Sequence, residues 1–143
     1  MPHYFFNELQ KSQILAAINR AEHKTSGEIR VHLELNCDGD VLNRASEVFE
    51  KLKMHKTSLR NGVLIYMAID DRKFAIIGDA GINKNVNQDY WNKLCDETTE
   101  MFKNKQFSEG ICHSIFSIGQ ILKEFYPYQS DDINELSDEI SFG

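Results

Sequence analysis

The longest apolar run of the chain, residues 63–69, is the feature that most constrains its fold. Every residue of this run, Val-Leu-Ile-Tyr-Met-Ala-Ile, is apolar or aromatic, and several are β-branched. A strand that is covered on both faces has this composition, so residues 63–69 are predicted to form the central strand of a sheet. Turn-forming and charged residues at 70–73 precede a second apolar run at 74–77, which predicts an antiparallel return beside the first.

The segments before this hairpin show one helical and one extended pattern. Residues 8–23 follow Asn7, a favourable N-cap, and the helix that they predict covers one face of the sheet. Its apolar stripe comprises Leu9, Ile14, Leu15, Ile18 and Ala21. Residues 29–35 alternate apolar with polar side chains, which predicts a half-exposed strand. A second helix, capped by Asp40, then completes a right-handed βαβ unit with the central strand.

The C-terminal half is predicted to be helical. Capping residues at 83–87 precede one helix, and Ser108 begins another, which Pro127 ends. The order of elements is then helix, strand, helix, strand, strand, helix, helix. This order predicts an α/β fold, a three-layer α/β/α sandwich with a small mixed sheet.

The length of 143 residues fits one domain. We assign the folded body to residues 1–127 and an acidic C-terminal tail to residues 128–143. The tail holds five acids and no Lys or Arg, which predicts mobility. Its apolar residues offer anchors that could instead dock on the body or on a protein partner. These anchors are Ile133, Leu136, Ile140 and Phe142.

Charge and cysteine content argue against several functional classes. The formal net charge is −6, whereas nucleic-acid binding relies on concentrated Lys and Arg, so cations are the expected ligands and nucleic acid is not. Three cysteines without CxxC spacing predict neither a disulfide framework nor a structural zinc site. The sequence has no signal-peptide pattern and no apolar run near the roughly 20 residues of a membrane span. A cytoplasmic location without a membrane span is therefore expected.

Polar residues gather at two ends of the predicted sheet. At the first, three glycine-bearing loops meet, and glycine permits close backbone approach to a bound ion. Glu28 and Asp79 would supply hard oxygen ligands for calcium or magnesium, and Asn61 and main-chain carbonyls around Gly81 would complete the shell. The alternative is that these are turn glycines with solvated acids, or that Arg60 pairs with one of the acids.

The opposite end of the sheet holds an alternative cation site. Its four aspartates are Asp38, Asp40, Asp70 and Asp71. Residues 36–47 partly match a calcium-binding EF-hand loop, but Val41 stands where the sharp turn needs Gly, so this motif is rejected. No recognised Ser-His, Cys-His or phosphate-loop motif occurs in the chain.

Several short motifs resemble the TPM domain family and together span roughly residues 8–126. They are Thr-Ser-Gly-Glu-Ile-Arg-Val at 25–31, Asn-Gly-Val-Leu-Ile at 61–65, the Asp-Asp-Arg turn at 70–72, Gly-Asp-Ala-Gly-Ile at 78–82 and Phe-Ser-Glu-Gly at 107–110. The resemblance implies a Rossmann-like α/β/α sandwich, an acid phosphatase label, nucleotide hydrolysis and divalent-cation binding. It does not carry over the signal peptide and membrane helix of many members.

The chain departs from the family pattern at two places. Arg60 stands where the family often has an acid, and residues 78–81 read Gly-Asp-Ala-Gly in place of Gly-aromatic-Gly. The acidic ligand is therefore expected to have moved to Asp79.

The leading hypothesis is a protein that binds calcium or magnesium through Glu28, Asn61 and Asp79. As an enzyme, it would hydrolyse a phosphate-containing small molecule with metal assistance, with Asp79 and Arg60 as catalytic residues. The alternative is a non-catalytic module that recognises another protein and uses the cation for stability.

Overall fold

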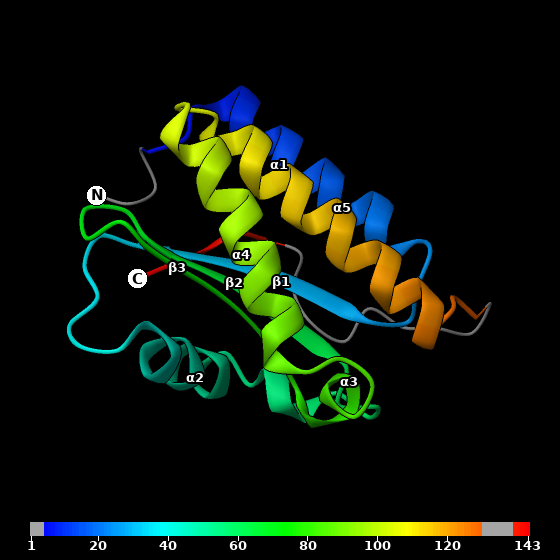
Figure 1. The fold of residues 1–143 in the computed structure, drawn as a ribbon. Coiled ribbons are helices and arrows are strands. Elements are labelled where there is room, and N and C mark those ends of the chain that lie inside the picture. Colours follow the sequence, from blue (N-terminus) through cyan, green and yellow to red (C-terminus); the bar gives the residue numbers. More distant parts are fainter. Residues whose placement is uncertain (1–4, 130–138) are drawn as a thin grey trace.

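The computed structural model describes residues 5–129 and 139–143 as a mixed four-stranded sheet between two layers of helices (Figure 1). The elements are α1 (Glu8–Glu22), β1 (Glu28–Glu34), α2 (Val41–Lys51), the 3₁₀ turn η2 (Met54–Lys56), β2 (Gly62–Ala68), β3 (Lys73–Gly78), α3 (Ala80–Asn83), α4 (Gln88–Lys103), α5 (Phe107–Phe125) and β4 (Ser141–Phe142). The strand order is β3-β2-β1-β4, in which only β3 runs antiparallel to its neighbour. The predicted α/β sandwich with a small mixed sheet is confirmed.

The apolar run forms β2, and burial on both faces explains its composition. Val63 belongs to a core formed with α1, α4 and α5, and Leu64 belongs to a second core under α2. β3 returns antiparallel beside it, from Ala68 opposite Lys73 to Val63 opposite Gly78. The predicted central hairpin is therefore correct.

Helices cover the sheet unequally. In Figure 1, α1, α4 and α5 lie on one face of the sheet and α2 lies on the other. The pair α1 and α5 approaches closely at Gly119, where an added Cβ would lie 2.9 Å from the Cβ of Ala21. A side chain at position 119 would push the two helices apart.

Two expectations about exposure were wrong. Strand β1 is buried along nearly its whole length, including Glu28, His32 and Glu34. Arg44 of α2 reaches over to pair with Glu34, and β4 pairs with the outer edge at His32 and Leu33. Alternation of polar and apolar residues therefore did not indicate a solvent-exposed face here. Leu9, assigned to the apolar stripe of α1, is 67% exposed, whereas Ile18 in the same helix is fully buried.

The end of the chain takes part in the sheet. Ser141 and Phe142 pair in parallel with β1, and the amide of Gly143 donates to the carbonyl of Leu33 at 2.7 Å. Ile140 packs against the larger core. Two other expected anchors, Ile133 and Leu136, lie outside the described residues. The short helix α3, which begins after Asp79, was not predicted.

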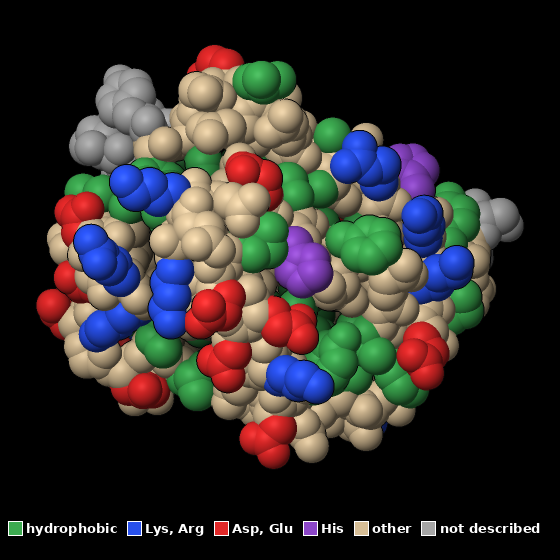
Figure 2. All heavy atoms as spheres, turned by 45° about the horizontal axis from the view of Figure 1, so that its top comes forward, with side chains coloured by type: hydrophobic (Ala, Val, Ile, Leu, Met, Phe, Trp, Pro, Cys, Tyr) green, Lys and Arg blue, Asp and Glu red, His purple; other side chains and the backbone are tan. Residues whose placement is uncertain are grey.

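Charged side chains of both signs are spread over the face that Figure 2 shows, with Lys and Arg on its left and right sides and Asp and Glu between and beside them. Among the helices that the structure describes, none is long and apolar enough to span a membrane.

The different burial of Ile18 and Leu9 in α1 predicts different effects of their substitution on stability. Ile18→Ala should lower the free energy of unfolding by about 2–4 kcal/mol, because it leaves a cavity in a closed core. Leu9→Ala in the same helix should change it by less than about 0.5 kcal/mol. Urea unfolding followed by circular dichroism measures both. Equal losses for the two variants would contradict this placement of α1.

Candidate functional site

The structure brings together the three loops that were predicted to meet. We call this region the Asp79 end of the sheet and define it as residues 25–28, 59–62 and 78–81. The amide of Glu28 donates to the carbonyl of Asn61 at 3.4 Å, and the Asn61 side chain donates to the carbonyl of Ser26 at 3.4 Å. The amide of Asp79 donates to the carbonyl of Gly62 at 2.9 Å. Because β1 and β2 run in parallel and β3 returns, the topology alone produces this convergence.

An ion pair occupies the centre of the Asp79 end. Arg60 donates from Nε and Nη2 to the two carboxylate oxygens of Asp79, each at 2.7 Å. The Asp79 side chain is only 5% exposed, whereas that of Arg60 is 49% exposed. Hydrogen bonding to Asp79 raises the pKa of the Arg60 guanidinium. Asp79 also caps α3 by accepting from the amide of Ala80 at 2.7 Å.

The backbone around this pair is constrained. Arg60 has φ of 52°, in the left-handed region that costs a residue with a Cβ about 1 kcal/mol. Its carbonyl accepts from the amide of Gly81 at 2.8 Å. A Cβ at Gly81 would lie 2.1 Å from the carbonyl oxygen of Leu59, so no side chain fits there.

The oxygen atoms at the Asp79 end could bind a divalent cation only after the Arg60 side chain has moved. Both carboxylate oxygens of Asp79 already hold Arg60, so a cation would have to displace that side chain. Across residues 5–129 and 139–143, no group of three or more His, Cys, Asp or Glu side chains is arranged to hold a metal ion. A cation here would therefore depend on the buried Glu28 and Asn61 and on main-chain carbonyls.

The second predicted cation site lies at the Asp71 end of the sheet, defined as residues 36–40 and 69–73. Its aspartates have separate local roles. Asp40 caps α2, and Asp71 accepts from the amide of Cys37 at 2.7 Å. Asp38 and Asp70 are exposed.

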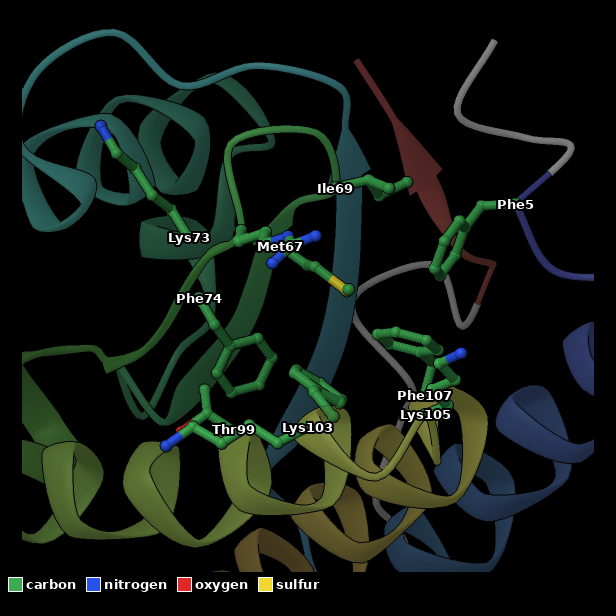
Figure 3. A pocket seen from close by; sticks show the side chains of 11 residues that line it. Phe5, Met67, Ile69, Lys73, Phe74, Thr99, Lys103, Lys105 and Phe107 are labelled. Carbon is green, nitrogen blue, oxygen red and sulfur yellow. The ribbon is translucent and has the colours of Figure 1, made fainter.

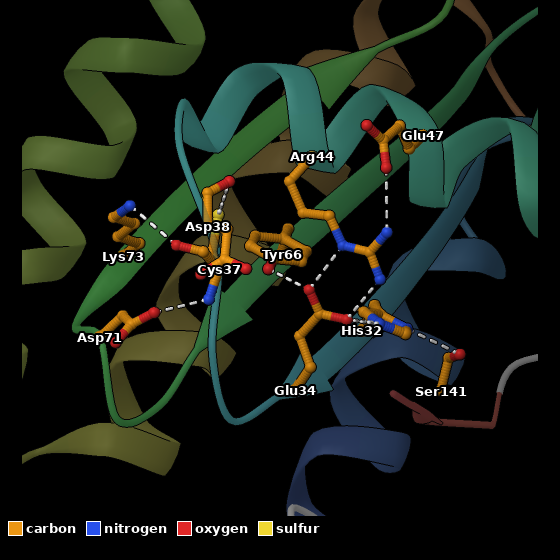
Figure 4. Close-up of polar contacts among 10 residues, drawn as sticks. All are labelled: His32, Glu34, Cys37, Asp38, Arg44, Glu47, Tyr66, Asp71, Lys73 and Ser141. Carbon is orange, nitrogen blue, oxygen red and sulfur yellow. Dashed lines mark hydrogen bonds and ion pairs between the residues drawn. The ribbon is translucent and has the colours of Figure 1, made fainter.

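A side-chain cation already occupies the carbonyls of the Asp71 end. The ammonium of Lys73 donates to the carbonyl of Cys37 at 2.8 Å (Figure 4) and to the carbonyl of Gly39 at 2.7 Å. Main-chain carbonyls that could have helped to bind a metal ion are thus used by a lysine.

A buried polar cluster beside the Asp71 end was missed by the sequence interpretation (Figure 4). At its centre, Glu34 accepts two hydrogen bonds from the Arg44 guanidinium, at 2.8 and 2.9 Å. The hydroxyl of Tyr66 also donates to Glu34, and the His32 ring lies 3.2 Å from it. The other ring nitrogen of His32 is 2.9 Å from the hydroxyl of Ser141 in β4. The cluster therefore joins β1, β2, α2 and β4.

Burial and hydrogen bonding within the cluster lower the pKa of some of its members and raise the pKa of others. Burial on its own raises the pKa of Glu34, but hydrogen bonds from Arg44, Tyr66 and His32 outweigh it and hold the pKa at about 2. Burial lowers the pKa of His32, although Glu34 opposes this effect. Burial and the hydrogen bond to Glu34 both raise the pKa of Tyr66. At neutral pH the cluster thus holds one carboxylate, one guanidinium and neutral rings.

One signal in the sequence could have revealed this cluster. Tyr66 lies inside the otherwise apolar central run, and a buried tyrosine hydroxyl needs an acceptor. In the parallel register Tyr66 lies opposite His32, two residues before Glu34. The partners from α2 and β4 are distant in sequence, so the pattern of β1 alone does not indicate them.

This chain was compared with protein-family models, with solved structures and with curated proteins. The family model described as the TPM domain matches residues 3–121. The solved BA42 protein of the psychrophilic bacterium Bizionia argentinensis is 44% identical, with 97% of this chain and 96% of that chain covered and a TM-score of 0.89. Comparison with curated proteins finds no match.

Two more distant structures share the fold alone. The N-terminal domain of a protein from P. gingivalis is 14% identical, with 88% of this chain and 83% of that chain covered and a TM-score of 0.71. The N-terminal domain of cg2496 from Corynebacterium glutamicum is 13% identical, with 82% and 74% covered and a TM-score of 0.65.

The Glu34 cluster predicts a specific acid sensitivity. The folded-state pKa of about 2 lies below the ordinary 4.5, so the stabilisation is complete above pH 4.5 and is lost as the pH falls toward 2. Between pH 6 and pH 3, the wild type should lose about 2 kcal/mol more free energy of unfolding than Glu34→Gln. Urea unfolding at both pH values measures this difference.

Glu47→Gln is the matched control for that comparison. Glu47 pairs with the same Arg44 at 3.1 Å but is 68% exposed, so this variant should follow the wild-type profile. Parallel pH profiles for the wild type and Glu34→Gln would contradict the assigned role of Glu34.

Proposed function

The chain belongs to the TPM domain family, and on this premise we propose that it binds a divalent cation, calcium or magnesium, at the Asp79 end of the sheet. Glu28, Asn61 and Asp79 would supply the side-chain oxygens, with main-chain carbonyls around Gly81. With only two carboxylates in this set, a dissociation constant of about 10⁻⁴ to 10⁻³ M is expected.

The observation that carries the proposal is a buried carboxylate held by an exposed cation. A buried carboxylate is costly unless a positive charge compensates it, and at Asp79 that charge comes from Arg60. The Arg60 side chain is half exposed, so the guanidinium can move into solvent when an incoming divalent cation takes over the compensation of the buried Asp79 charge. Arg60 would thus act as an internal counter-ion that a divalent cation replaces.

If a divalent cation replaces Arg60 at Asp79, substitutions of these two residues should have opposite effects on calcium affinity. Arg60→Gln removes the competitor and should tighten calcium binding by roughly three- to ten-fold, whereas Asp79→Asn should weaken it at least about ten-fold. Amide NMR during a calcium titration should show shifts at Glu28, Asn61 and residues 79–82. Shifts confined to the Asp71 end would instead assign the site to the four aspartates there.

The chain offers a matched control at the Asp71 end. Asp40 and Asp79 both cap a helix, and asparagine is an equally good N-cap residue, so either Asp→Asn change keeps the local cap. Asp40→Asn should therefore bind calcium as the wild type does. Equal weakening by both substitutions would mean that only the total negative charge matters.

We infer metal-assisted phosphoester hydrolysis as the use of this site. A divalent cation would neutralise phosphate charge and activate water. Arg60, when displaced from Asp79, would present Nε and Nη2, the same pair of donors that binds a phosphate group bidentately. It could then stabilise charge that develops on the phosphoryl oxygens.

Arg60→Gln should have opposite effects on cation affinity and on the rate of phosphate release. The variant should bind calcium or magnesium more tightly yet release phosphate from para-nitrophenyl phosphate at least about ten-fold more slowly than the wild type. Asp79→Asn should lose both properties, and Asp40→Asn should keep both. Equal phosphate release by all four proteins would favour the alternative, a non-catalytic protein-interaction module in which the cation only raises the melting temperature.

A further inference from the structure

A cleft at the Asp71 end of the molecule has the features of a ligand site, and it lies outside the residues of the Asp79 end that are proposed to bind a cation. We propose that it binds a small amphipathic carboxylate, with an apolar body against an aromatic wall and the carboxylate directed toward Arg72 and Lys105. The cleft has a volume of about 500 Å³, within the range of small-molecule sites. It lies between the β2–β3 hairpin, the N-terminal segment and the α4–α5 turn (Figure 3).

A continuous series of aromatic rings forms one wall of the cleft. Successive ring centroids are 5.4 Å apart for Phe5 and Phe107, 5.6 Å for Phe107 and Phe102, and 5.2 Å for Phe102 and Phe74. Gly110 in α5 leaves room for this wall, because a Cβ there would lie 2.7 Å from the Phe102 ring. Burial of an alkyl or aryl body against these rings would be favourable.

The charged residues that line the cleft are all basic. Its lining includes Arg72, Lys73, Lys103 and Lys105 and no acidic residue, although the whole chain carries a net charge of −6. In Figure 3 the Lys73 side chain points away from the cavity, and its ammonium is held by the carbonyls at the Asp71 end. Lys103 pairs with Glu100 at 3.0 Å. An anionic ligand complements this rim and a cationic ligand does not.

Arg72 and Lys105 are the cations available to a ligand. Within the described residues, neither side chain makes a hydrogen bond or an ion pair. An arginine can bind a carboxylate through two parallel hydrogen bonds, and a lysine adds a point charge. A carboxylate therefore suits the head of the ligand.

Backbone conformation supports the same assignment. Arg72 has φ of 54° and Lys105 has φ of 61°, so both lie in the left-handed region that favours glycine. Each is one of four described non-glycine residues with positive φ, and these two border the same cleft. Strained positions occupied by functional side chains are frequent in binding sites.

The strained backbone also allows a variant that removes charge without harming the fold. Arg72→Gly and Lys105→Gly each delete one cation and relieve the positive φ, so neither should destabilise the protein. Lys53→Gly is the matched control, because Lys53 has φ of 59° and also carries one positive charge but does not line the cleft.

The test uses octanoate and the full chain without divalent cations, so its result is independent of the cation proposal. Amide NMR of the wild type should show saturable shifts at Met67, Ile69, Thr99 and Lys105. Octanol, with the same chain and no charge, should bind roughly three- to five-fold more weakly, and octyltrimethylammonium more weakly still. Equal affinity for the three probes, or octanoate shifts outside the cleft, would overturn the proposal.

The variants give a second and independent outcome. Arg72→Gly and Lys105→Gly should each raise the dissociation constant for octanoate by roughly three- to five-fold, and Lys53→Gly should leave it unchanged. Thr99→Trp, which places a ring in the cavity from the partly exposed face of α4, should weaken octanoate at least about ten-fold. Wild-type affinity in Thr99→Trp, or equal weakening by all three glycine variants, would refute the site.

Discussion

The rest of the structure depends on the burial of both faces of β2. A strand without a polar face needs a covering layer on each side, and one helix alone cannot supply both. The core with α1, α4 and α5 covers one face, and α2 covers the other. The parallel neighbour β1 and the antiparallel return β3 then bring three loops together at the Asp79 end and two at the Asp71 end. Both the Asp79 end and the Asp71 end are consequences of that arrangement.

The sequence was sufficient for those features that local pattern and topology determine. The run at 63–69 forms β2 as far as Ala68, the turn that follows it ends before Lys73, and Asn7 and Asp40 are the N-caps that were predicted. The meeting of Arg60 with Asp79 followed from the same topology, and the sequence interpretation had kept an Arg60 ion pair as an alternative. These features need only local capping and turn signals, together with the rules that a helical crossover joins parallel strands and a short turn joins antiparallel ones.

The features that were missed depend on contacts between distant segments. The polar residues of β1 indicated solvent, but Arg44 ten residues later and Ser141 more than a hundred residues later enclose them. Periodicity describes one element at a time. It therefore cannot distinguish a face that is exposed to solvent from a buried face whose polar groups are hydrogen-bonded within the protein. The cleft was missed for the same reason, because its wall is assembled from the N-terminal segment, the hairpin and the α4–α5 turn.

Gly81 has a consequence for how sequence variation in such proteins is interpreted. The space for a side chain at this position is filled by the carbonyl oxygens of Leu59 and Arg60, so selection for folding alone would keep glycine invariant. Asp79, two residues earlier, is the residue that the proposed cation would need, yet asparagine would preserve its helix cap. Invariance at position 81 would therefore report a steric requirement, whereas a ligand requirement would be visible only in whether position 79 keeps its charge.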